Sequence, residues 1–133
     1  MKEEILSLIH HRLEQAEDSI NEAKLLQKEG MSFRSVMNRL YYAMFYSMLA
    51  LLQQKGIGTS KHIGAISLFV KEFIKNGAFD KELSKRLHRA FELRQKSDYL
   101  EQTEISEQDI EEMFPKAVDF VNTIKNYLLD VKK

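Results

Sequence analysis

The chain has 133 residues, of which 44% are hydrophobic and 30% charged, a length and composition typical of one folded domain. Lys plus Arg and Asp plus Glu number 20 each, so no net charge draws the whole protein to nucleic acid or to an anionic membrane. The absence of cysteine excludes disulfides, zinc–thiolate sites and thiol catalysis. The sequence therefore predicts a single domain over residues 1–133, cytoplasmic, without a signal peptide or a membrane span.

Apolar residues recur every three or four positions along most of the chain, which is the spacing of one face of an α-helix. This spacing predicts a first helix over residues 2–29 and a second over residues 32–55. The second is apolar on nearly every side, which is typical of a helix enclosed by neighbouring helices or by a partner chain. Gly30, Gly56 and Gly77 each follow a predicted helix, where glycine commonly adopts the left-handed conformation that ends it.

Three more helices are predicted in the second half of the chain. The third covers residues 61–76, and the fourth covers residues 80–101 with Asp80 as its N-cap. The fifth begins with SEQD at residues 106–109, which resembles a capping box, and Pro115 should kink or split it. With no strand alternation and only short connections, the sequence predicts an all-α, antiparallel, up-and-down bundle of four to five helices.

Two charged residues stand where the apolar stripe of the fourth helix continues. Leu87 and Ala90 belong to the stripe, and Arg94 and Asp98 follow at helical spacing. This alignment indicates partial burial, and buried charges need an ion pair or hydrogen bonds. The Arg94–Asp98 pair could serve only to fix the helix register. The functional alternative is an arginine that Asp98 orients at the rim of a cleft, where its guanidinium group binds a phosphate.

The second helix carries polar side chains on its otherwise apolar surface. Arg39, Tyr42 and Tyr46 share one face, and Asn38 precedes Arg39. Arg39 has no acidic residue three or four positions away, so its partner must come from another helix, another chain or a ligand. Tyrosines at such positions are commonly core residues with one hydrogen-bonded hydroxyl, so a core role and a ligand-binding role are both open here.

Lys61 and His62 stand at the expected start of the third helix. Cationic side chains are mildly unfavourable at the positive end of a helix dipole unless an anion binds there. The pair therefore indicates either a phosphate site or a solvated helix start. His10, His11 and His88 lack the spacing of metal ligands and are predicted to be surface residues, and we expect no metal or other cofactor.

Four segments of the chain together resemble a known family. In order and spacing, NRLYYAMFYSMLALLQQKG, KHIG, FIKNGAFD and LRQKSDYL resemble the HEPN domains of prokaryotes, especially the small stand-alone proteins. The pairing of RxYYAxF with RxxxDY is more specific than either motif alone. The resemblance covers nearly the whole chain. It implies a four- or five-helix bundle, commonly a homodimer, with a cleft between facing helices or protomers.

The resemblance also implies a function. Many HEPN proteins are metal-independent ribonucleases or modules that bind nucleotides or RNA. Prokaryotic members are often encoded beside a minimal nucleotidyltransferase, with which they form a toxin–antitoxin system or a two-part complex. The family's active-site arginine matches Arg94. The polar positions that line the cleft in this subgroup match Asn38, Arg39, Tyr42, Lys61, His62, Asp98 and Tyr99.

One departure from the family bears on catalysis. Ribonuclease-type HEPN domains carry a histidine shortly after the arginine, whereas residues 99–101 of this chain are Tyr, Leu and Glu. RNA cleavage without a metal needs proton transfer to and from the reacting oxygens, and a cation beside the developing phosphorane charge. Arg94 could supply the cation and His62 the proton transfer, whereas Tyr99 with a pKa near ~10 would be a poor base.

The sequence therefore favours a module that binds the phosphate of a nucleotide or RNA and acts with a nucleotidyltransferase partner. Two alternatives stay open. One is a metal-independent endoribonuclease that lacks the usual histidine, with Arg94 as a catalytic residue and His62 as its substitute base. The other is a structural subunit without a ligand.

Overall fold

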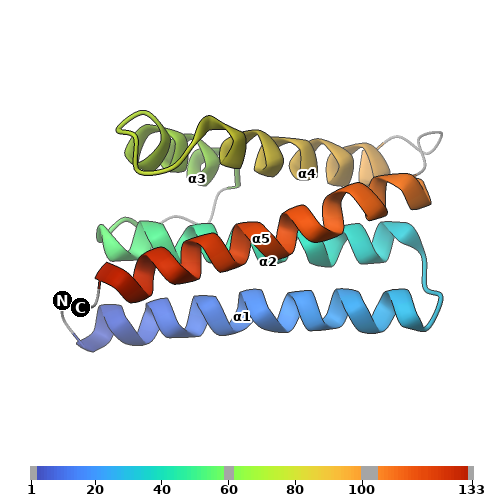
Figure 1. The fold of residues 1–133 in the computed structure, drawn as a ribbon, viewed down its shortest axis with the longest axis horizontal. Helices are drawn as coiled ribbons and strands as arrows, with labels where there is room; N and C mark the ends of the chain where they lie inside the picture. The colour runs from blue at the N-terminus through green and yellow to red at the C-terminus, as the bar shows by residue number, and fades with distance from the viewer. Residues whose placement is uncertain (1–2, 59–61, 100–104, 132–133) are drawn as a thin grey trace.

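The structure is a computed structural model that describes residues 3–58, 62–99 and 105–131. In chain order its elements are α1 (Glu3–Lys28), α2 (Phe33–Gln54), α3 (His62–Phe69), the π-helical turn η1 (Val70–Ile74), α4 (Lys81–Tyr99) and α5 (Glu107–Val131). No strand occurs among these residues, and the predicted all-α bundle is confirmed. Figure 1 shows α1, α2, α4 and α5 along the long axis of the molecule, each antiparallel to the one before. None of the described helices is long and apolar enough to cross a membrane.

The central helix of the bundle is α2, as the sequence predicted. It packs against α1, α3, α4 and α5, so the chain itself covers its apolar surface. Leu40, Met44, Met48 and Leu51 are completely buried along its length. Burial of each such side chain contributes about 1.5–3 kcal/mol to folding. α2 is therefore the element against which the other helices are positioned.

The helix ends follow the predicted signals. Gly30, Gly56 and Gly77 have φ values of 68°, 75° and 83°, the left-handed region that residues with a Cβ rarely adopt. Ser32 caps α2 by accepting a 3.2 Å hydrogen bond from the backbone N–H of Ser35. These local signals fix where α1, α2 and η1 stop and where α2 starts.

α5 begins with a reciprocal capping box and runs through its proline. The Ser106 backbone N–H donates to Asp109 Oδ2 at 3.0 Å, and the Asp109 N–H donates to Ser106 Oγ at 3.1 Å. Pro115 does not split the helix, which is continuous from Glu107 to Val131 (Figure 1). Pro115 and Glu111 are both exposed, so water can hydrogen-bond the Glu111 carbonyl that the proline leaves without a backbone donor.

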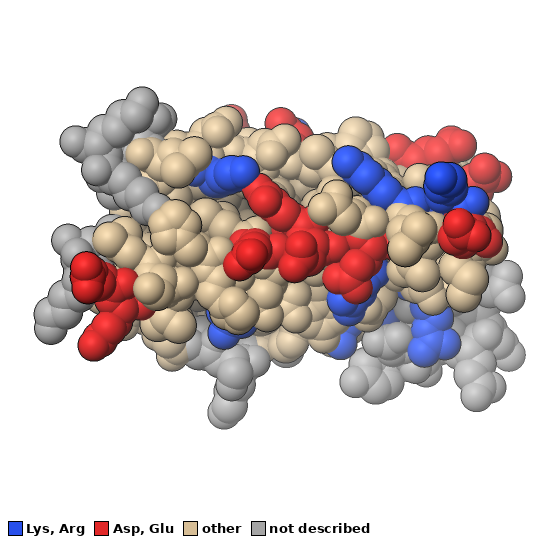
Figure 2. Space-filling view, turned by 90° about the horizontal axis from the view of Figure 1, so that it is seen from below, with Lys and Arg blue, Asp and Glu red and all other residues tan. Residues whose placement is uncertain are grey.

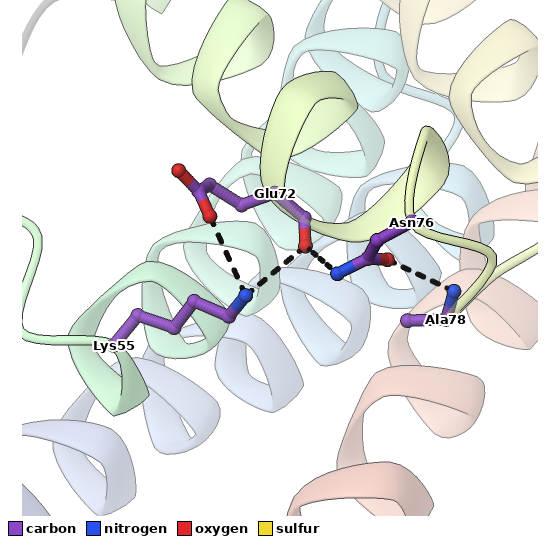
Figure 3. Close-up of polar contacts among 4 residues, drawn as sticks. All are labelled: Lys55, Glu72, Asn76 and Ala78. Atoms are coloured by element: carbon purple, nitrogen blue, oxygen red, sulfur yellow. Dashed lines mark hydrogen bonds and ion pairs between the residues drawn. The ribbon is translucent and has the colours of Figure 1, made fainter.

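The predicted third helix differs from expectation because it changes to a π-helical turn after Phe69. Within η1 the Lys75 N–H donates to the Val70 carbonyl at 2.9 Å, five residues back. The Glu72 carbonyl accepts hydrogen bonds from Lys55 Nζ at 3.2 Å and Asn76 Nδ2 at 2.5 Å (Figure 3). Side chains from outside the turn therefore supply the donors that the altered backbone pattern lacks.

Lys55 joins the end of α2 to η1. Its Nζ lies 3.4 Å from Glu72 Oε2 and 4.8 Å from the centroid of the Phe73 ring. An exposed ion pair and an exposed cation–π contact each contribute about 0.2–1 kcal/mol. We therefore expect Lys55→Met to lower the free energy of unfolding by about 1 kcal/mol in urea denaturation followed by circular dichroism.

The matched control for this prediction is Lys71→Met. Lys71 is an exposed lysine of η1, so the substitution makes the same chemical change at a position without these contacts. We expect it to change the free energy of unfolding by less than about 0.5 kcal/mol. Equal losses in the two variants would show that Lys55 has no special role in holding η1.

Candidate functional site

Arg94 lies half-buried on α4, against two tyrosines of α2. Its Nη2 donates a 3.2 Å hydrogen bond to the hydroxyl of Tyr42. Its Cζ lies 5.2 Å from the ring centroid of Tyr41 and 5.2 Å from that of Tyr42. A guanidinium group over aromatic rings is favourable by about 0.5–2 kcal/mol per contact, depending on how well water is excluded. The rings therefore help to hold Arg94 at the end of the apolar stripe.

His62 begins α3 and packs among the same aromatic rings. Its Nδ1 lies 2.8 Å from the hydroxyl of Tyr41, which is completely buried. Its ring stacks on Phe45, with centroids 4.1 Å apart and planes 8° apart, and meets Tyr42 edge-on at 5.7 Å. Three helices thus bring together what we call the Arg94–His62 cluster, which comprises Tyr41, Tyr42, Phe45, His62 and Arg94.

The cluster changes the acid–base properties of two of its members. Burial lowers the pKa of His62, and the positive charge of Arg94 lowers it further. Burial raises the pKa of Tyr41 far above its usual value, although the charge of Arg94 opposes part of the rise. Near pH 7 the histidine is therefore neutral and the tyrosine protonated. If the Tyr41 hydroxyl donates to Nδ1, the Nε2 of His62 carries the proton and can donate a hydrogen bond.

The lowered pKa of His62 predicts a pH dependence of stability. The unfolded chain has the ordinary histidine pKa of ~6.5, so on acidification the unfolded state takes up this proton before the folded state does. The contribution of this group to the free energy of unfolding is fully present above pH ~6.5, and it is lost as the pH falls below that value. We expect urea denaturation between about pH 7 and pH 5.5 to show a falling free energy of unfolding. This fall should be smaller in His62→Gln.

The control for the pH dependence is His88→Gln. His88 is exposed on α4, and its Nδ1 lies 2.8 Å from the Ser84 carbonyl, away from the cluster. We expect its substitution to leave the slope of stability against pH as in the wild type. An unchanged slope in His62→Gln, or an equal change in both variants, would contradict the assignment.

Arg39 lies half-buried on α2, near Tyr42 of the cluster. Its Nη2 donates a 2.7 Å hydrogen bond to Asn38 Oδ1, and its Nη1 lies 3.8 Å from Glu22 Oε2 on α1. Of the three sources predicted for the partner of Arg39, which were another helix, another chain and a ligand, the structure shows an acidic residue from another helix. The Arg39 Cζ also lies 5.1 Å from the Tyr42 ring centroid, so Tyr42 contacts the guanidinium groups of both Arg39 and Arg94.

The other predicted residues are placed as follows. Lys61 lies outside the described residues. Asp98 and Tyr99 belong to the last turn of α4, but their side chains lie outside the described part, and the Arg94–Asp98 pair stays a prediction. His10 and His11 are exposed on α1, as expected. Among the described residues, no group of His, Asp and Glu side chains could hold a metal ion.

Sequence reasoning missed the part that Tyr41 and Phe45 play in positioning His62. Both fit the apolar stripe of α2, and both are buried. The only signal in the sequence is the adjacent pair of tyrosines at 41 and 42, which places one hydroxyl toward the core and one toward the edge of the helix surface. Such a pair does not show which residue from another helix will reach either hydroxyl.

A model of the HEPN domain family matches residues 9–127. The chain belongs to the HEPN family. It is 39% identical over 132 residues to a "UPF0332 protein" from Thermotoga maritima. The aligned residues cover 99% of this chain and 97% of the relative. It is 37% identical over 118 residues to "Putative toxin MJ0142" from Methanocaldococcus jannaschii, covering 88% of this chain and 79% of that one. A second protein of that organism, "Putative toxin MJ0605", is 33% identical over 131 residues, covering 98% and 93%.

Proposed function

We propose that this HEPN protein binds a phosphate group of a nucleotide or RNA at the Arg94–His62 cluster. The observation that carries the proposal is the position of Tyr42, whose ring has the guanidinium group of Arg39 at 5.1 Å and that of Arg94 at 5.2 Å. Both arginines are half-buried, so they remain accessible to a ligand in surroundings less polar than water. A phosphate between them would be attracted by both charges.

The donors around this position suit a phosphate. A guanidinium group offers two parallel N–H donors that match two phosphate oxygens, and the contacts with the tyrosine rings help to hold it in place. If the Tyr41 hydroxyl donates to Nδ1 of His62, the Nε2–H of His62 adds a second type of donor. Tyr42 and Tyr46 are half-buried with ring centroids 5.7 Å apart, so their exposed parts could stack against a nucleobase.

The charge on the opposite side of the bundle favours the same placement. Figure 2, which views the bundle from the α1 side, shows acidic side chains gathered across the middle of that face. α1 contributes exposed Glu14, Glu17 and Asp18. A polyanion would be repelled from this face. A phosphate ligand is therefore expected on the side where α2, α3 and α4 meet.

The proposal includes a toxin-like role with a nucleotidyltransferase partner. Two relatives carry the word toxin in their names, which supports the toxin-like role. The nucleotidyltransferase and the homodimer rest on the family resemblance. Light scattering of the purified protein, alone and mixed with a minimal nucleotidyltransferase, tests both. We expect the mass of a dimer and then a larger complex, and a monomer that forms no complex would refute this part.

A second candidate function is metal-independent RNA cleavage, and it is favoured by one observation. His62 and Arg94 contact the same two tyrosines, although they come from different helices. If Nδ1 of His62 donates to Tyr41, its Nε2 has a free lone pair that can accept the proton of a 2′-hydroxyl. Arg94 would then stabilise the phosphorane charge. The histidine missing after Arg94 in the sequence would be replaced from α3.

The experiment is incubation of end-labelled, mixed-sequence single-stranded RNA with the protein in EDTA, with binding followed by fluorescence anisotropy and cleavage by gel. The variants are Arg94→Gln, His62→Gln and Arg86→Gln. Arg86 lies on the same helix but pairs with Asp119 of α5 at 2.5 Å, so it is a matched control.

The proposal predicts that the wild type binds the RNA without cleaving it. Binding should be lost in Arg94→Gln and retained in Arg86→Gln. Cleavage that requires Arg94 and His62 would establish the second candidate. If the folded wild type neither binds nor cleaves the RNA, the remaining interpretation is a structural subunit without a ligand.

A further inference from the structure

A hollow of about 500 Å³ lies at the start of α2, beside the Arg94–His62 cluster. It is lined by Leu26, Ser32, Arg34, Ser35, Asn38 and Arg39. We call it the α2 hollow. Its lining contains two arginines, two hydroxyls and one amide, and no carboxylate. These are the side-chain types that most often donate hydrogen bonds to the phosphates of nucleic acids.

Arg39 connects the α2 hollow with the cluster. Its guanidinium group lines the hollow and also lies over the Tyr42 ring, on which Arg94 stacks from α4. Because each guanidinium carbon lies within 5.2 Å of the Tyr42 centroid, the two are no more than about 10 Å apart. Arg34 lines the same hollow as Arg39. The three arginines therefore form a continuous basic path.

We infer that the α2 hollow is a second phosphate subsite, and that the ligand is a single-stranded polynucleotide with at least two phosphates bound. This inference rests on the proposed function, which supplies the first subsite at Arg94. Successive phosphates of one strand are a few ångströms apart, so a short stretch of backbone can reach along the path. The half-buried tyrosine rings beside it favour a single strand, because bases can stack on a side chain only when they are not stacked in a duplex.

One acidic group competes for Arg39. The Glu22 carboxylate lies 3.8 Å from its Nη1, but 54% of the Glu22 side chain is exposed. Exposed pairs at this distance are weak, and a polynucleotide phosphate can replace the carboxylate as the partner of Arg39. Glu22→Gln is therefore expected to strengthen polynucleotide binding.

The test measures the affinity of fluorescent oligoribonucleotides of one and eight nucleotides, at several salt concentrations, for the wild type and four variants, which are Glu22→Gln, Arg34→Gln, Arg89→Gln and Arg94→Gln. Arg34→Gln should weaken binding of the octamer about tenfold and leave the mononucleotide unchanged. It should also reduce the slope of log affinity against log salt for the octamer by about 0.7, the value for one lost single-strand phosphate contact. Arg89→Gln is the control and should change neither, because Arg89 is a half-buried arginine of α4 that lies 3.8 Å from Asp109 and lines no part of the α2 hollow.

The outcomes separate this inference from the proposed function. If Arg94→Gln weakens both ligands while Arg34→Gln leaves the octamer and its salt slope unchanged, the first subsite stands and the second is overturned. Equal affinity of the wild type for one and eight nucleotides also overturns the second subsite. If Arg94→Gln has no effect on either ligand, or the wild type binds neither, the proposed function fails and this inference fails with it. Arg34 is exposed, so its substitution is not expected to unfold the protein.

Discussion

Phe69→Ala is expected to lower the free energy of unfolding by about 3–5 kcal/mol, because it would leave a cavity where α3, η1 and α5 meet. Phe69 is completely buried, and its ring centroid lies 6.2 Å from Phe73, 6.4 Å from Phe79 and 6.0 Å from Phe120. A cavity among the three remaining aromatic rings cannot close without moving several of them, which places the loss in the upper part of the usual range. Urea denaturation of the variant measures it.

The control for this cavity is Phe33→Ala, which removes the same side chain from the first turn of α2. Phe33 is 42% exposed, so we expect a loss well below that of Phe69→Ala, within about 1 kcal/mol. His62 is the first residue of α3 and Phe69 is the last, so Phe69→Ala should also loosen the placement of His62. Similar losses in the two variants would contradict the description of Phe69 as a core residue.

Arg94→Lys is expected to weaken binding of single-stranded RNA at least tenfold, although it keeps the charge. A lysine has one compact ammonium group, which cannot offer two parallel donors or stack flat on a tyrosine ring. The contacts of Arg94 with the rings of Tyr41 and Tyr42 and with the Tyr42 hydroxyl would all change. Anisotropy titrations at one fixed salt concentration measure the effect.

Arg86→Lys is the control for Arg94→Lys, because it replaces guanidinium by ammonium at another position of the same helix. Arg86 forms its ion pair with Asp119 on α5 and lies away from the proposed site, so Arg86→Lys should bind RNA as the wild type does. If Arg94→Lys also binds as the wild type does, the phosphate requires only a positive charge. The stacked guanidinium group would then have no special role.

Much of the fold could be predicted because its signals are local. Gly30, Gly56 and Gly77 mark helix ends by a conformation that depends on the residue itself. The capping box at Ser106 and Asp109 is decided by four neighbouring residues. The π-helical turn η1 could not be predicted in this way, because Lys55 supports it from the end of α2.

The candidate site was predictable only in part, because its contacts join residues of different helices. The periodicity of α4 places Arg94 at the end of an apolar stripe, and the periodicity of α2 places Arg39 and Tyr42 on one face. Periodicity describes one helix at a time, so it does not state which helices face each other. The hydrogen bond between Tyr41 and His62, and the contact of Tyr41 with Arg94, depend on how α2, α3 and α4 are rotated in the bundle. Only the packed structure contains that information.

The most direct measurement is an NMR titration of ¹⁵N-labelled protein with an RNA octamer, observing the arginine Nε–H and histidine ring signals. The account predicts that the signals of Arg94, Arg39 and His62 shift progressively with added RNA, while the signal of Arg86 stays in place. If saturating RNA shifts the signal of Arg86 and leaves the signals of Arg94 and His62 unchanged, the ligand binds elsewhere. That result would contradict the account.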